Sequence, residues 1–315
     1  MLIRGDGKFI IPIKIIKSSE LGIVENQKNI FLKNDIKDRL RALATEISNG
    51  NKPRINAIWL ETSGCFGEII SLLNGEDPDI LYLLEQIYNI RYFESIQGDE
   101  GEKAYEILLD TLNTEFVFIV SGAIPLNENG LCTIVAAYKD RKITALEAVK
   151  FIAPKAKHII TVGTCASYGG PTAASPNPTG AVGLEEALNR KDIIKIPGCP
   201  ANPQWVIETL GYLAVAGNIN LDSDGRPTAY YGELIHDRCP RRRFFDAGVF
   251  AEKYGDEECM FLPGCRGPVT YAYCPVSRWN NSDNWPIGDN TTCIGCAAAG
   301  FPDKMQTFAN YGGRI

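Results

Sequence analysis

Histidine is almost absent from this chain of 315 residues, which contains two, and methionine is nearly as rare, with three. Zinc sites that combine cysteine with histidine therefore have few ligands to draw on. No run of about 18 apolar residues occurs, so the sequence predicts no transmembrane helix. An excess of basic residues is missing too: the net charge of -6 argues against a general nucleic-acid-binding protein, and we expect no nucleic-acid partner.

The first residues lack the features of an export signal. The apolar run in MLIRGDGKFIIPIKIIKSSE is broken by charges, no small-residue cleavage site follows, and no Arg-Arg pair stands near the start. We therefore expect a cytoplasmic protein, with a peripheral position at a membrane still open. Nucleotide-binding signatures are missing as well, because no GxGxxG follows a strand and no GxxxxGK[ST] occurs.

Cysteine, by contrast, is abundant, with ten residues. Disulfides are typical of small secreted domains, and zinc sites usually contain paired CxxC units, whereas this chain has one CxxC, Cys293 to Cys296. Iron–sulfur clusters take thiolates from scattered loops, sometimes with a histidine. From the residues alone, iron–sulfur clusters are about as probable as disulfides and zinc sites taken together.

Residues 1–54 are predicted to form an added segment that packs on the body of the protein or on a partner. FIIPIKII is a candidate edge strand, because Pro12 limits strand pairing. Asn34 is a candidate N-cap of a helix that ends near Gly50. The apolar side of that helix would consist of Ile36, Leu40, Leu43 and Ile47.

From residue 55, candidate strands alternate with candidate helices, which predicts an α/β domain over 55–218 with a parallel sheet covered on both faces. The strands are 55–61, 116–122, 158–163 and 193–198, and the helical stretches are 77–89, 102–113, 144–156 and 203–217. Ligands of such sheets lie beyond the carboxyl ends of the strands. Cys65, Cys165 and Cys199 each follow a strand, so we expect them at that edge.

Regular periodicity fades after residue 218, although 219–315 contains six cysteines. Metal ligation can order such a segment, because the binding energy becomes folding energy. We therefore predict a smaller, largely irregular second domain. The ligand candidates fall into three groups along the chain: Cys65, Cys165 and Cys199; His236, Cys239, Cys259 and Cys265; and Cys274, Cys293 and Cys296.

Seven motifs make the sequence similar to a known family. WLETSGC, GTCASYGG, PGCPANP, HDRCPRRRFFDAGVF, CMFLPGCRGP, CPVSRWNNSDNWP and CIGC-x4-FPDKM occur in the order found in nickel–iron hydrogenase small subunits, over roughly residues 55–305. The resemblance implies a flavodoxin-like domain followed by a smaller iron–sulfur domain. It also implies a large-subunit partner that contains the nickel–iron centre, an external electron acceptor, and a higher oligomer of heterodimers.

The resemblance also implies two 4Fe-4S clusters and one 3Fe-4S cluster. The proximal set would be Cys65, Glu68, Cys165 and Cys199; the distal set His236, Cys239, Cys259 and Cys265; and the medial set Cys274, Cys293 and Cys296. The family can place a fourth cysteine between Cys274 and Cys293, where this chain reads Trp285-Pro286, so a three-iron medial cluster is implied. No residue of this chain is expected to be catalytic, because hydrogen is cleaved in the partner.

Glu68 departs from the usual pattern, since the family commonly has cysteine there and some branches have a carboxylate. Iron accepts carboxylate oxygen, so Glu68 is a sensible ligand, although it could instead be an ordinary first-turn helix carboxylate. The oxygen-tolerant six-cysteine variant is excluded, because Gly67 and Gly170 stand at its extra cysteine positions.

Five other positions carry expectations outside these sets. Cys132 is interpreted as a buried inert thiol and His158 as a packed core residue. Arg241, Arg242 and Arg243 are either a solvated basic run or residues that offset cluster charge or dock an acidic electron acceptor. Two rival functions remain: an electron-transfer subunit related to quinone-reducing complexes, and a zinc-stabilised interaction protein.

Overall fold

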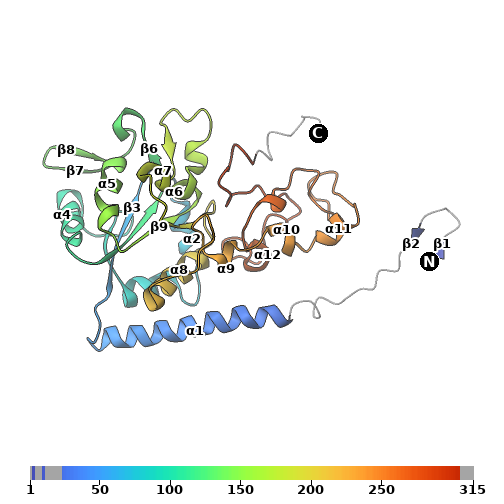
Figure 1. Cartoon of the computed structure of the whole chain (residues 1–315), viewed down its shortest axis with the longest axis horizontal. Helices are drawn as coiled ribbons and strands as arrows, with labels where there is room; N and C mark the ends of the chain where they lie inside the picture. The colour runs from blue at the N-terminus through green and yellow to red at the C-terminus, as the bar shows by residue number, and fades with distance from the viewer. Residues whose placement is uncertain (1, 4–8, 11–22, 306–315) are drawn as a thin grey trace.

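A five-stranded parallel sheet forms the centre of the molecule (Figure 1). The computed structural model of the chain describes residues 2–3, 9–10 and 23–305. The strands are β3 (Ile55–Glu61), β4 (Tyr88–Phe93), β5 (Phe116–Ser121), β9 (His158–Val162) and β11 (Ile194–Ile196). Their order across the sheet is β4-β3-β5-β9-β11, which is the flavodoxin-like order and confirms the predicted α/β class.

Both faces of this sheet are apolar because neighbouring residues of a strand point to opposite sides. In β3, Trp59 belongs to the core formed with α8 (Pro203–Ala216), whereas Ile58 belongs to the core formed with α4 (Gly101–Thr111) and α5 (Ala145–Ile152). The predicted helices α4, α5 and α8 are thus confirmed. Asn202 and Thr144 cap α8 and α5 through their side chains.

The N-terminal helix α1 (Ile23–Ser48) is longer than the sequence predicts. Asn34 lies inside it and is not its N-cap, so that prediction was wrong. The predicted apolar side is confirmed: Leu40 is buried in the core beside Gly211 of α8, with Ile36, Leu43 and Ile47 packed around it. Of the candidate strand FIIPIKII, Phe9–Ile10 forms β2, which pairs with β1 (Leu2–Ile3), and the rest lies outside the described residues.

The helix predicted over 77–89 is wrong at its end, where residues 88 and 89 belong to a strand. A short helix, α3 (Ile80–Tyr82), continues as a π-helical turn, η1 (Leu83–Ile87), and the chain then enters strand β4. The helix ends there because YNIRYF pairs in parallel with β3, and the hydrogen bonds of the sheet outweigh the helical pattern that the sequence continues from the preceding residues. The sequence prediction missed this fifth strand.

The chain beyond α8 is irregular, as predicted. Its helices are single turns: α9 (Thr228–Tyr231), α10 (Ile235–Arg238), α11 (Arg242–Asp246), η5 (Gly267–Val269) and α12 (Cys274–Ser277). They lie on the opposite side of the molecule from α4 and α5 (Figure 1).

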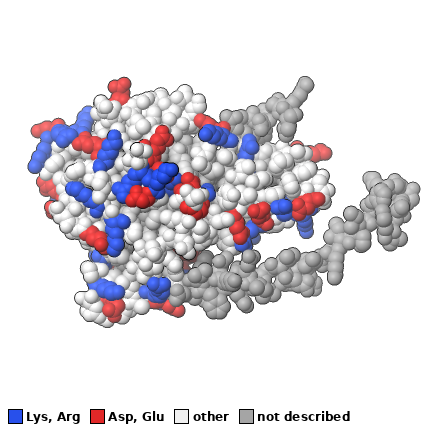
Figure 2. Space-filling model, viewed as in Figure 1, with Lys and Arg blue, Asp and Glu red and all other residues white. Residues whose placement is uncertain are grey.

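Short elements complete the sheet part. They are α2 (Gly67–Leu72), β6 (Ile124–Pro125), η2 (Asn127–Gly130), β7 (Ile134–Tyr138), β8 (Arg141–Thr144), η3 (Ala153–Lys155), α6 (Thr164–Tyr168), η4 (Gly170–Ala173), β10 (Ala181–Val182) and α7 (Leu184–Leu188). Figure 2 shows acidic and basic side chains interspersed on the face in view, so no patch of one sign dominates that face. No helix in the described part of the chain is long and apolar enough to cross a membrane.

Candidate iron–sulfur cluster sites

Three cysteines gather beyond the carboxyl ends of the sheet strands, as predicted. Cys65 follows β3, Cys165 lies in the first turn of α6 after β9, and Cys199 lies in the loop after β11. Burial and, after it, the nearby Cys296, Cys165, Glu68 and Cys65 together raise the pKa of the Cys199 thiol to about 12. The proximal set therefore converges at one place although its members are up to 134 positions apart in sequence.

Glu68 belongs to this convergence. It lies in the first turn of α2, but its carboxylate accepts a hydrogen bond from the Ala201 amide at 2.8 Å, in the loop of Cys199. Burial raises the pKa of this carboxyl to about 7, and the Ala201 amide partly opposes the rise. The carboxylate also closely approaches Gly163, where an added Cβ would lie 2.2 Å from its Oε1. Glu68 thus faces the loops that carry the proximal cysteines, and not open solvent.

The medial and distal sets form two further groups. Cys274, Cys293 and Cys296 all have thiol pKa values raised mainly by burial, and Cys293 lies near both of the others. His236, Cys239, Cys259 and Cys265 line one small cavity. Burial, followed by Arg242, lowers the pKa of His236, which favours the neutral imidazole, the form that can offer a lone pair to a metal. The ring of Phe245 packs edge-on against it at 4.5 Å.

Backbone amides point at several of these sulfurs. The amides of Gly67, Gly267 and Gly295 donate to the sulfurs of Cys65, Cys265 and Cys293, each at 3.4 Å. Such bonds stabilise thiolate, which is the form that binds iron, and they raise the reduction potential of a bound cluster. The donor set therefore fits iron–sulfur clusters.

Two amide–sulfur contacts connect the three sets in series. The backbone amide of Cys199, in the proximal set, lies near the sulfur of Cys296 in the medial set and lowers the pKa of that thiol. The backbone amide of Cys293, in the medial set, lies near the sulfur of Cys265 in the distal set and lowers the pKa of that thiol. The medial set therefore lies between the other two.

The spacing of these ligands does not suit single metal ions. No three His, Cys, Asp or Glu side chains within the described ranges are placed to hold one ion. A tetrahedral zinc ion, with zinc–sulfur bonds of about 2.3 Å, would require its sulfurs to lie within about 4 Å of one another. A cluster of three or four irons takes its ligands at wider spacing than a single ion.

Two sequence interpretations outside these sets were wrong. Cys132 is exposed, because it lies in a turn ahead of the short hairpin of β7 and β8 and not inside the core. His158 is only half-buried, because it begins β9 at the edge of the core beside Lys157.

The basic run after Cys239 is mostly engaged within the protein. Arg241 donates to the backbone oxygens of Asp256 and Glu258, at 3.1 and 3.0 Å, and Arg242 forms an ion pair with Asp246 at 2.8 Å. The guanidinium of Arg243 lies over the Phe244 ring. Partners inside the chain therefore favour a structural role for Arg241 over a role in docking.

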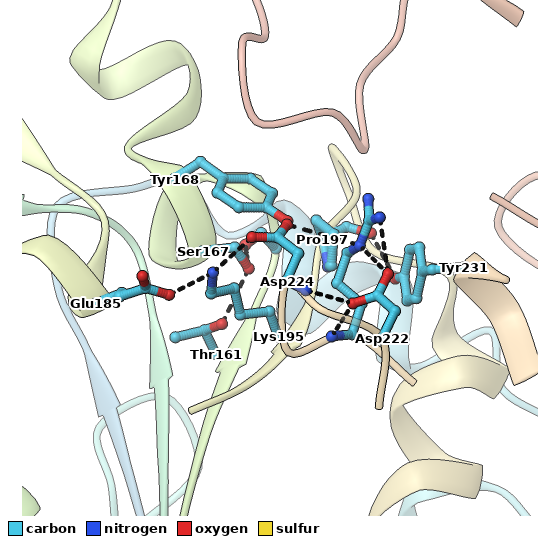
Figure 3. Close-up of polar contacts among 11 residues, drawn as sticks. Thr161, Ser167, Tyr168, Glu185, Lys195, Pro197, Asp222, Asp224 and Tyr231 are labelled. Atoms are coloured by element: carbon cyan, nitrogen blue, oxygen red, sulfur yellow. Dashed lines mark hydrogen bonds and ion pairs between the residues drawn. The ribbon is translucent and has the colours of Figure 1, made fainter. Parts of the chain in front are cut away.

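A buried polar network braces two of the proximal loops, and sequence reasoning missed it. Lys195, 3% exposed, pairs with Glu185 and Asp224, and the Tyr168 hydroxyl donates to Asp224 (Figure 3). The Tyr231 hydroxyl donates to the carbonyl of Pro197 at 2.7 Å (Figure 3). Tyr168 stands three residues after Cys165, and Pro197 two before Cys199. A lysine inside the apolar strand IIKIP was the only signal that could have indicated this network.

An exposed apolar surface borders the proximal set. Phe66, Ile70 and Leu73, on and beside α2, are 65%, 62% and 68% exposed, and Cys65 is itself exposed. Large apolar side chains grouped beside a buried polar site commonly mark a protein interface.

Comparisons with known proteins match both halves of the chain. The family described as the C-terminal part of the NiFe/NiFeSe hydrogenase small subunit matches residues 231–309, and one described as NADH ubiquinone oxidoreductase, 20 Kd subunit, matches residues 65–213. The periplasmic [NiFeSe] hydrogenase small subunit of Desulfomicrobium baculatum is 36% identical over 80% of this chain and 85% of its own length. The periplasmic [NiFe] hydrogenase small subunit of Solidesulfovibrio fructosivorans is 37% identical over 83% of each chain.

Solved structures agree with these sequence matches. A structure of the H2-activated [NiFeSe] hydrogenase of Dm. baculatum superposes with a TM-score of 0.76 at 33% identity, covering 81% of this chain and 98% of that one. The actinobacterial-type NiFe-hydrogenase of Ralstonia eutropha H16 superposes with a TM-score of 0.75 at 28% identity, covering 80% and 81%.

Proposed function

This chain belongs to the small-subunit family of nickel–iron hydrogenases, and we propose that its three ligand sets hold a proximal 4Fe-4S, a medial 3Fe-4S and a distal 4Fe-4S cluster. The proximal ligands are Cys65, Glu68, Cys165 and Cys199; the medial ones Cys274, Cys293 and Cys296; and the distal ones His236, Cys239, Cys259 and Cys265. The first cluster would lie in a domain of residues 55–218 and the other two in a domain of residues 219–315.

The chain is the electron-transferring subunit of a hydrogenase. Bound clusters would supply a path for electrons from hydrogen oxidation in the large subunit to an external acceptor. The chain's own residues supply the spacing, the amide donors to sulfur and the burial that tune each cluster's potential. The observation that carries this proposal is the series arrangement, in which Cys199 contacts Cys296 and Cys293 contacts Cys265.

The large subunit would cover the exposed surface around Phe66, Ile70 and Leu73, which borders the proximal set. Electrons would leave near His236, at the far end of the series. We propose further that the heterodimer forms a higher oligomer. An external acceptor of unknown chemical class completes the set of partners.

The rival function in quinone-reducing complexes explains less of the chain. The match to the 20 Kd subunit ends at residue 213, and the medial and distal sets lie beyond it. The hydrogenase C-terminal family covers residues 231–309 and therefore accounts for those sets.

Co-purification with the large subunit tests the proposed function. The complex should take up hydrogen with a dye acceptor, and iron analysis of this chain should give eleven irons, the sum for two four-iron clusters and one three-iron cluster. Oxidised protein should show a three-iron paramagnetic signal, because the medial set offers three thiolates. Zinc in place of iron, or three four-iron clusters, would contradict the proposal.

Glu68→Gln should selectively damage the proximal cluster. The amide keeps the shape of the side chain and can still accept from Ala201, but it replaces a charged iron ligand with a weak one. We expect a changed proximal spectrum, unchanged medial and distal signals, and a fall in hydrogen oxidation of at least about tenfold. Glu76→Gln is the matched control, since Glu76 is an exposed carboxylate just beyond α2. An unchanged proximal spectrum in Glu68→Gln would mean that another group holds that iron.

A further inference from the structure

The side chain of Thr164 lies where three ligand-bearing loops meet. It is fully buried and directly precedes Cys165. Its amide donates to the Gly198 carbonyl at 2.8 Å, and its hydroxyl accepts from the Gly198 amide at 2.9 Å, so the loop of Cys199 is held on both sides. The same hydroxyl donates its proton to the carbonyl oxygen of Cys296.

We propose that Thr164 is a positioning residue that sets the contact between the proximal and medial clusters; the inference rests on the proposed function. The residues on either side of this contact belong to different domains of the proposed division. Gly198 and Cys199 follow strand β11, whereas Cys296 lies in the irregular C-terminal part. One hydroxyl group bonds to both segments.

The Thr164 hydroxyl bonds to the two segments whose approach places the Cys199 amide near the Cys296 sulfur, where that amide lowers the pKa of the thiol. An amide that donates to a cluster thiolate withdraws electron density and stabilises the reduced cluster, which raises its potential. Thr164 holds the donor side through Gly198, which precedes Cys199, and the acceptor side through the carbonyl of Cys296. Loss of the hydroxyl therefore weakens the alignment at both ends.

Removing the hydroxyl should also leave two buried backbone groups without a partner. The Gly198 amide and the Cys296 carbonyl would each lose a hydrogen bond, and a backbone group without a partner in the interior is destabilising. The loops would then move apart to find other partners. That movement widens the gap across which electrons pass from the proximal to the medial cluster.

The test compares Thr164→Val with Thr164→Ser in the complete heterodimer. Valine keeps the shape and removes the hydroxyl, whereas serine keeps the hydroxyl. Thr161→Val is the matched control, because Thr161 is equally buried in β9 and its hydroxyl pairs with Ser167, away from Cys296 (Figure 3). Three quantities are measured. They are the redox potentials of the medial and distal signals, the rate of hydrogen oxidation with a dye, and the rate at which the partner's metal site exchanges isotopes between dihydrogen and deuterated water.

Thr164→Val should lower the medial potential, leave the distal potential unchanged, and reduce hydrogen oxidation several-fold. The isotope exchange between dihydrogen and deuterated water should be unchanged, because this reaction at the partner's metal site does not require electrons to leave through this chain. Thr164→Ser should restore the wild-type medial potential, and Thr161→Val should match wild type. If valine prevents assembly, Thr164→Ala, which cannot crowd the site, supplies the same measurements.

Two outcomes would overturn the inference. The first is a wild-type medial potential and turnover in Thr164→Val or Thr164→Ala. The second is a defect that serine fails to restore, which would show that the methyl group and not the hydroxyl matters. Neither outcome bears on the proposed function, which would fail only if the wild-type complex lacked the clusters or the hydrogen uptake.

Discussion

Purified without its large subunit, the chain is expected to oxidise no hydrogen. The single CxxC of the sequence, Cys293 to Cys296, lies in the medial set, so no paired thiolates remain to hold nickel. Activity with a dye acceptor should stay at background, whereas the same preparation combined with large subunit should take up hydrogen. Robust oxidation by the nickel-free chain alone would contradict the assignment.

The isolated chain should also associate or aggregate. Phe66, Ile70 and Leu73 would present exposed apolar side chains beside the proximal set, where an obligate interface normally covers such groups. Size-exclusion chromatography of the chain with and without its partner measures this. A matched variant, Ile70→Lys, should make the isolated chain more soluble and weaken its assembly with the large subunit. Unchanged assembly of that variant would place the interface elsewhere.

Gly163→Ala should remove the proximal cluster. A methyl group at Gly163 would lie 2.2 Å from Oε1 of Glu68 and 2.5 Å from its carboxyl carbon, so the carboxylate would have to leave its place. The backbone of Gly163 adds strain, because its φ of +87° costs an alanine about 1–2 kcal/mol. We expect loss of the proximal signal and a fall in hydrogen oxidation of at least about tenfold.

Gly217→Ala separates the clash from the strain. Gly217 ends α8 with a similar φ of +74°, and an added Cβ would meet nothing within 4 Å. This control should lower the stability of the complex by about 1–2 kcal/mol but leave all three cluster signals intact. If both glycine variants lose the proximal cluster equally, strain explains the effect and the approach of Glu68 does not. A Gly163→Ala, Glu68→Ala double variant should be less damaged than the sum of the two single variants, because each acts on the same contact.

Much of the fold could be predicted because the sheet is buried on both sides. Strands such as FVFIVS and HIITV are predominantly apolar, and the predicted helices lie between or directly after such strands in the sequence. Strand β4 was not predicted, because the helical pattern of ILYLLEQIY runs directly into YNIRYF without a glycine or proline between them. The start of α1 was predicted too late, because Asn34 has the side chain of an N-cap although the helix continues on both sides of it.

The ligand candidates could be predicted from residue chemistry and from their places after strands. Few residue types bind iron, and the carboxyl ends of parallel strands necessarily meet at one edge. The same reasoning failed for Cys132 and His158, because a short apolar stretch predicts burial without revealing whether another element covers it.

The α/β class, the family and the set of residues able to bind iron all follow from the order of amino acids alone. Which of those residues are neighbours follows only from the folded chain, since contacts such as Glu68 with Ala201 or Cys199 with Cys296 join segments about a hundred or more positions apart. Thr164, Lys195 and Gly163 carry no cluster-binding chemistry of their own. Their roles follow from the packing of the loops. Thr164 bonds to a backbone carbonyl, Lys195 pairs with a carboxylate, and Gly163 leaves room for the carboxylate of Glu68.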